Sequence, residues 1–322
     1  MALLDRRLLI VTGKGGTGKT SVAAALGVLA ARQGKRVLVA EIAGERLSGL
    51  FGHAPVGHHE TKVEERLSLL AIEPIAAAHD FLRGQVGAAV HRVIFQNRLF
   101  TLTMTAAPGL REVSTVDRLW DLTRRDRGRR HPTYDLVIVD APATGHALAM
   151  LRSPATYGGL ARGGPIKKRA DEMASLLQDP ARTGAVLCAL PEETPVNETL
   201  ETAASLRELR VDLGLVVLNR TLGTLLQDDE ADAVGALASD ASGGPSDATG
   251  GVAVRAADCV ALRAAAPIVV EHRRARREET QRARLREGLP DRVPLTALER
   301  RPAEVLRADL GALADLLAKD AA

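Results

Sequence analysis

The pattern of apolar and polar positions first indicates a strand, a glycine-rich turn, a helix and a second strand, in that order. Leu8–Thr12 is a short, continuous apolar run that ends in glycines, which is typical of a buried parallel strand. Thr20–Gln33 is rich in Ala and apolar all round, as a helix packed on a sheet would be, and Arg36–Ala40 is the next apolar run. Together these segments predict a βαβ unit, whose crossover should be right-handed.

Later apolar runs predict that the sheet continues. We expect strands at Leu67–Ile72, Tyr134–Val139, Val186–Leu190 and Leu215–Leu218, and the short run Pro267–Val270 is compatible with one more. The pattern is helical over residues 76–130 and again, with many Arg and Glu, over Ala275–Glu287. The expected fold is α/β, a doubly wound and mainly parallel sheet in a single domain spanning residues 1–322. An α-helical insert is expected at 76–130 and a flexible Gly/Ser/Asp loop at 239–251.

Composition changes this picture only by exclusion. The chain has 322 residues. Its net charge of +3 is too small, and its 2% of aromatic residues too few, to indicate nucleic acid as a partner. Its two cysteines form no CxxC pair, the N-terminus has no signal-peptide pattern, and the apolar runs are too short to span a membrane. We therefore expect a cytoplasmic protein.

The turn after the first strand carries the strongest chemical signal. It satisfies G-x-x-x-x-G-K-[ST] between a strand and a helix, the context of a phosphate-binding loop. Its glycines allow backbone N–H groups to surround an anion, and the following helix adds its positive end. We expect ATP to bind here, with Lys19 on the β- and γ-phosphates and the Thr20 hydroxyl on Mg²⁺. The predicted nucleotide-binding residues of this loop are Gly13, Lys14, Gly15, Gly16, Thr17, Gly18, Lys19, Thr20 and Ser21.

Asp140 is the expected second metal ligand. It follows the apolar run Tyr134–Val139 and opens the segment DAPATGH. A carboxylate directly after a buried strand is where a Mg²⁺-coordinating acid lies in nucleotide-binding folds of this kind. An ordinary Asp that caps the turn is the alternative.

Several segments resemble the ArsA-type ATPase family of arsenite-pump ATPases and tail-anchored-protein targeting ATPases. Lys14 and Lys19 give the doubled lysine of the phosphate-loop class that also includes MinD, ParA and nitrogenase iron protein. DAPATGH is similar to the family's D-T-A-P-T-G-H segment, and PEET at 191–194 with ET at 198–199 resembles its "P-E … E-T" segment. Val216–Asn219 resembles the strand whose Asn contacts adenine.

That resemblance implies an ATP hydrolase that works as a dimer. It implies that Lys14 is catalytic by reaching the nucleotide of the partner subunit, that Lys19 is catalytic in its own subunit, and that Asn219 binds the nucleotide. For Asn219, a structural role in a strand-to-loop turn is the alternative. The family's usual water-positioning Asp is Ala43 in this sequence. We therefore expect Glu41 to hold the water shell of the Mg²⁺ and Glu45 to be a candidate for positioning the attacking water, with hydrolysis that is slow or depends on a partner.

The sequence leaves two classes of function open for the predicted ATPase. One is a carrier or targeting factor for a hydrophobic or ionic client, such as an unknown protein or a membrane partner. The other is a MinD/ParA-like switch or positioning protein that binds a partner and uses hydrolysis as a reset. Arsenite binding is not expected, because As(III) needs clustered thiolates and the chain has two isolated cysteines.

Overall fold

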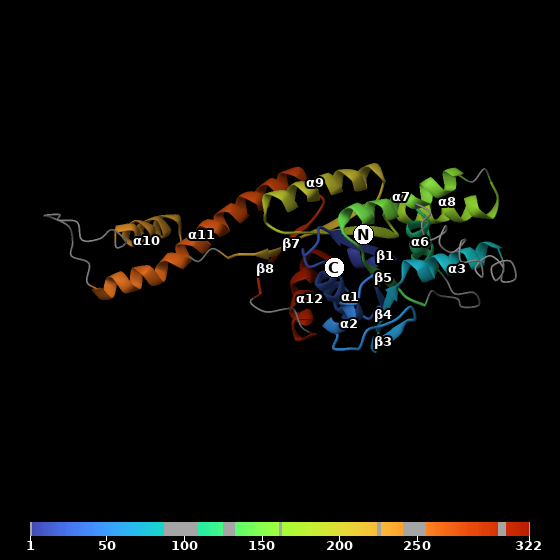
Figure 1. Cartoon of the computed structure of the whole chain (residues 1–322), viewed down its shortest axis with the longest axis horizontal. Coiled ribbons are helices and arrows are strands. Elements are labelled where there is room, and N and C mark those ends of the chain that lie inside the picture. Colours follow the sequence, from blue (N-terminus) through green and yellow to red (C-terminus); the bar gives the residue numbers. More distant parts are fainter. Residues whose placement is uncertain are drawn as a thin grey trace.

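The protein folds around one mixed but mainly parallel sheet, shown in the computed structural model in Figure 1. The structure describes residues 2–86, 109–124, 133–160, 163–223, 227–240, 256–301 and 307–321. Within these ranges the sheet has eight strands in the order β3-β4-β2-β5-β1-β6-β7-β8. The strands are β1 Leu8–Gly13, β2 Val37–Ile42, β3 Thr61–Glu64, β4 Leu67–Ile72, β5 Leu136–Asp140, β6 Thr183–Ala189, β7 Leu213–Thr221 and β8 Leu295–Glu299.

The described helices cover both faces of this sheet (Figure 1). They are the 3₁₀ turn η1 Leu3–Asp5 and the α-helices α1 Lys19–Arg32, α2 Leu47–Leu50, α3 Pro74–Val86, α6 Leu110–Thr123, α7 Thr144–Leu160, α8 Gly164–Gln178, α9 Glu193–Glu208, α10 Asp228–Asp240, α11 Ala256–Gly288 and α12 Arg307–Ala321. Side chains alternate between the faces along each strand. In β1, Leu8 and Ile10 join the core under α6 to α9, whereas Leu9 and Val11 join the core under α1 and α12. The expected α/β, doubly wound architecture is confirmed.

Every described strand pair is parallel except β3 with β4. Because β5 lies between β1 and β2, the carboxyl ends of these three strands meet at one edge. Ligands of open α/β sheets bind at that edge. The phosphate loop follows β1, and Asp140 ends β5, so the fold brings the two predicted halves of the site together.

The run Pro267–Val270 was compatible with a strand, and that interpretation is wrong. It lies inside α11, a helix of 33 residues. Four apolar residues cannot by themselves distinguish a strand from part of a helix, and here the flanking segments are helical on both sides. Val269 is buried, whereas its neighbours Ile268 and Val270 are exposed. With α10, the first half of α11 extends away from the sheet (Figure 1).

The predicted insert at 76–130 is described only in part. Its described portions lie in α3 and α6, which pack against each other, while residues 87–108 and 125–130 lie outside the described residues. The loop predicted at 239–251 also lies outside them, apart from the last two residues of α10. Among the described helices, none combines the length and the apolar character that crossing a lipid bilayer demands.

Candidate functional site: the phosphate loop

The phosphate loop joins the carboxyl end of β1 to the start of α1, and two of its glycines have no room for a side chain. A Cβ on Gly13 would lie 2.1 Å from the carbonyl oxygen of Cys188 in β6. Gly18 has a φ of 89°, and a Cβ there would lie 2.2 Å from the side-chain nitrogen of Asn219. The motif glycines are therefore required by the packing of the neighbouring strands as well as by the turn.

Lys19 and Thr17 both bind the loop's own backbone. The Lys19 ammonium donates to the carbonyl of Lys14 at 3.1 Å, and the Thr17 hydroxyl donates to the same carbonyl at 2.9 Å. Gly18, the residue before α1, provides no side-chain cap for the helix. The first N–H groups of α1, on Lys19 to Ser21, therefore face the loop without side-chain acceptors, which is the arrangement that favours an anion.

Thr20 and Asp140 lie together, as the sequence predicts. The Thr20 hydroxyl donates to Oδ2 of Asp140 at 2.6 Å. Asp140 is 5% exposed, and its other oxygen, Oδ1, is buried with no hydrogen-bond partner among the described residues. The pKa of this carboxyl is raised to about 6, mainly by burial. The Thr20 hydroxyl and the Lys19 charge act to lower it, and the nearby Glu41 carboxylate adds to the rise.

This pair fits a small divalent cation. Mg²⁺ takes oxygen ligands, uses one or two protein groups and keeps several waters or phosphate oxygens. A buried carboxylate oxygen without a partner is costly unless something satisfies it. A cation beside Asp140 and the Thr20 hydroxyl would do so.

Glu41 lies next to this pair but is already engaged. It is paired in register with Asp140 across β2 and β5, and it is 6% exposed. Its carboxylate accepts the backbone N–H groups of Leu47 at 2.9 Å and Arg46 at 3.2 Å, so it caps the start of α2. The intervening Ala43 adopts a left-handed φ of 52°. Glu45, the other acidic candidate, is exposed.

Asn219 lies at the same edge, near the end of β7. Its amide nitrogen donates to the carbonyl of Thr17 at 2.9 Å, and its amide oxygen accepts the N–H of Arg220 at 2.9 Å. The side chain therefore ties β7 to the phosphate loop. Arg220 follows in a left-handed conformation, with a φ of 61°, at an irregularity in the pairing of β7 with β8 between Asn219 and Thr221.

Two contacts of the loop were not predicted from the sequence. The Thr12 hydroxyl donates to the carbonyl of Pro142 at 3.0 Å, which joins β1 to the segment after Asp140. The Lys14 ammonium donates to Oε1 of Glu198 in α9 at 2.6 Å. In the sequence Glu198 stands only in a segment that resembles the family, and no local pattern assigns its partner, because the two residues are 184 positions apart.

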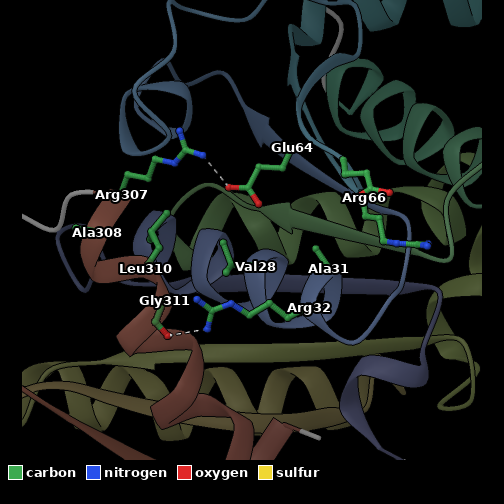
Figure 2. A pocket seen from close by; sticks show the side chains of 10 residues that line it. Val28, Ala31, Arg32, Glu64, Arg66, Arg307, Ala308, Leu310 and Gly311 are labelled. Atoms are coloured by element: carbon green, nitrogen blue, oxygen red, sulfur yellow. Dashed lines mark hydrogen bonds and ion pairs between the residues drawn. The ribbon is translucent and has the colours of Figure 1, made fainter.

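A pocket of about 420 Å³ lies elsewhere, between the end of α1, the turn from β3 to β4, and α12 (Figure 2). It contains none of the phosphate-loop residues. Arg32 is paired with Asp315, and Arg307 with Glu64, so two of its lining cations already have acidic partners. It is separate from the nucleotide site.

Comparison with known proteins identifies ATPases that are similar to this chain. The family model for anion-transporting ATPases matches residues 6–163, which include the phosphate loop and Asp140. The chain is 33% identical over 235 residues to the ATPase BagA of Mycobacterium tuberculosis H37Rv, covering 70% of this chain and 68% of that protein. It is 25% identical over 270 residues to the arsenical pump-driving ATPase of Escherichia coli, covering 74% of this chain and 45% of that protein.

Proposed function

The chain belongs to the anion-transporting (ArsA-type) ATPase family and hydrolyses ATP, and from that premise we propose that it works as a Mg²⁺-dependent homodimer. The dimer would close on ATP and open after hydrolysis, and this cycle would drive the handling of a client. The observation that carries the Mg²⁺ dependence is the Thr20–Asp140 pair beside the phosphate loop, with its buried and unsatisfied carboxylate oxygen.

Within one subunit the residues divide the work as follows. The N–H groups of Gly15 to Thr20 hold the phosphates, and Lys19 supplies positive charge to the β- and γ-phosphates. Thr20 and Asp140 hold Mg²⁺, which supplies further charge neutralisation when it is bound. Ser21 contributes from the first turn of α1, and Asn219 contacts the adenine edge with its amide.

Glu41 orients water around the metal site in this proposal. Its position beside Asp140 and its burial support that role. The two amide N–H groups that it accepts hold the carboxylate in one orientation. No carboxylate stands at Ala43, so hydrolysis should be slow.

Lys14 acts in the partner's site. A lysine added to a phosphate loop places a second positive charge where negative charge builds up in the transition state. In the single subunit the Lys14 ammonium is held against Glu198 in α9, and its side chain is 44% exposed. It is therefore accessible to a second subunit.

Mixing two inactive variants tests this proposal. Lys14→Ala should leave ATP binding nearly intact and lower turnover by about 10²–10³-fold, the usual effect of one transition-state donor. Asp140→Ala should also be inactive. In a mixed dimer, the site that lacks Lys14 receives an intact Lys14 from the Asp140→Ala subunit and keeps its own Asp140. Mixing should therefore restore part of the phosphate release, with a maximum that depends on the mixing ratio.

The control is formation of mixed dimers with ATP, measured by affinity capture of one tagged variant. If mixed dimers form and phosphate release stays at the level of the separate variants, Lys14 does not act in trans.

The client is proposed by class only. It is an ionic or a hydrophobic client, and the name of the arsenical pump-driving relative supports the ionic class. Arsenite itself is not proposed, because Cys188 is completely buried and burial raises the pKa of its thiol. The absence of a carboxylate at Ala43 favours a second candidate, a nucleotide-dependent switch or positioning protein in which slow hydrolysis acts as a reset.

A further inference from the structure

The Lys14–Glu198 ion pair connects the phosphate loop to a helix that the proposed mechanism does not use. The Lys14 ammonium and Oε1 of Glu198 are 2.6 Å apart, and the two side chains are 44% and 39% exposed. Glu198 lies in the second turn of α9, and its backbone carbonyl accepts the hydroxyl of Thr202 one turn later. The backbone of Glu198 is therefore fixed within the helix, and its carboxylate extends from there to Lys14.

The backbone and the side chain of Lys14 face different groups. Its carbonyl accepts Lys19 and Thr17 within the loop, while its ammonium is bound to α9. The ammonium of Lys14 is thus held by α9, while its carbonyl is held by side chains of its own loop.

We propose that Glu198 is a positioning residue that competes with nucleotide phosphate for the ammonium of Lys14. The inference rests on the proposed role of Lys14 in hydrolysis. An ammonium that makes a close pair with a carboxylate must leave it to contact a phosphate in the same way, and a carboxylate near a triphosphate is repelled by it. Where two separate subunits join to form the closed dimer, the ion pair therefore stabilises the separate subunits and raises the protein concentration at which turnover begins.

The size of the effect follows from the exposure of the pair. Exposed ion pairs are weak, and an interaction present in only one of two states shifts their equilibrium by no more than its own free energy. Removing the Glu198 charge should therefore shift the equilibrium between the resting subunit and the closed dimer on the order of two- to fivefold. This is much less than the effect on turnover expected from the loss of Lys14 itself.

The test is turnover measured against protein concentration for the full chain, with Glu198→Gln and the matched control Glu201→Gln. Glu201 is exposed and lies one turn further along the same helix. Glu198→Gln should lower the concentration for half-maximal phosphate release about two- to fivefold, with the same maximal rate and the same ATP affinity. Glu201→Gln should behave like the unmodified protein. The difference should shrink near 1 M salt, where the Debye length falls to about 3 Å.

A purely structural role for Glu198 would not depend on Lys14. The Lys14→Ala variant therefore distinguishes a structural role from competition for the Lys14 ammonium. Adding Glu198→Gln to Lys14→Ala should change nothing further. The proposal is overturned if Glu198→Gln leaves the half-maximal concentration unchanged, if it lowers the maximal rate, or if its effect persists without Lys14. If Lys14→Ala itself turns over normally, the proposed function has failed instead, and the two failures are distinguishable.

Discussion

At the scale of single residues, Asp140 shows the conflict between stability and function most directly. Its carboxyl is buried at the end of β5 with one oxygen unpartnered, and its pKa is raised to about 6, mainly by burial. A raised pKa means that the folded protein prefers the protonated form. In the nucleotide-free and metal-free protein, the Asp140 carboxyl therefore makes its full contribution to the free energy of unfolding below about pH 4. That contribution is lost as the pH rises through about 6.

Asp140→Asn should accordingly stabilise the nucleotide-free and metal-free protein above pH 6, by about 1–3 kcal/mol, because it removes a buried charge and keeps the shape. The gain should decrease as the pH falls from 6 towards 4. Urea unfolding at several pH values measures it. With Mg²⁺ and ATP the order should reverse, since only the unmodified protein has the carboxylate for the metal. A stability difference that does not vary with pH would contradict this account.

At the scale of elements, the junction between β2 and α2 combines a structural and a proposed functional role. Glu41 caps α2 through two backbone N–H groups, and Gly44 is required beneath it, because a Cβ there would lie 2.0 Å from Oε1 of Glu41. The same carboxylate lies beside Asp140. Its capping hydrogen bonds are a fact of the structure, and its place around the metal remains a prediction.

Glu41→Gln separates the two roles. The amide has one oxygen in place of two, so one of the N–H groups of Arg46 and Leu47 should lose its acceptor. The free energy of unfolding should fall by about 1–2 kcal/mol. If Glu41 also orients water around the metal, turnover at saturating Mg²⁺ should fall at least tenfold while ATP binding persists. Steady-state phosphate release and calorimetric ATP titration would measure the two effects. Normal turnover in a destabilised variant would leave Glu41 a capping residue only.

At the scale of the whole molecule, the sheet is continued by elements from the last third of the chain. β8 adds to β7, α12 covers the face above α1, and α11 packs beside α9 before it extends away with α10. Within the described residues, no cluster of three or more His, Cys, Asp or Glu could hold a metal ion. Cys188 lies fully buried in β6.

Arsenite should therefore not stimulate ATP hydrolysis. A soft As(III) centre needs clustered thiolates, and the buried Cys188 cannot contribute one without opening the sheet. Phosphate release measured with increasing arsenite, alongside a known arsenite-stimulated ATPase as a positive control, tests this. A clear, saturable rise would show that the ligand set includes groups beyond Cys188.

The sequence by itself determined the elements whose signals are local. The apolar run before the glycines predicts β1, the motif predicts the loop and the start of α1, and the acid after Tyr134–Val139 predicts the end of β5. Strands buried on both faces have little freedom in composition, and a phosphate loop fixes glycines by backbone geometry. These features can be read from neighbouring residues alone.

Only the tertiary structure decided which distant groups meet. Strand order placed β5 between β1 and β2, so that Asp140 meets Thr20 and Glu41. Long-range packing also bound Asn219 to the loop 202 positions away and gave Lys14 its carboxylate partner in α9. It likewise placed Pro267–Val270 in a helix. The physical reason is that side-chain pairing and the choice between strand and helix for a short apolar run depend on which surfaces are packed together, and no local pattern contains that information.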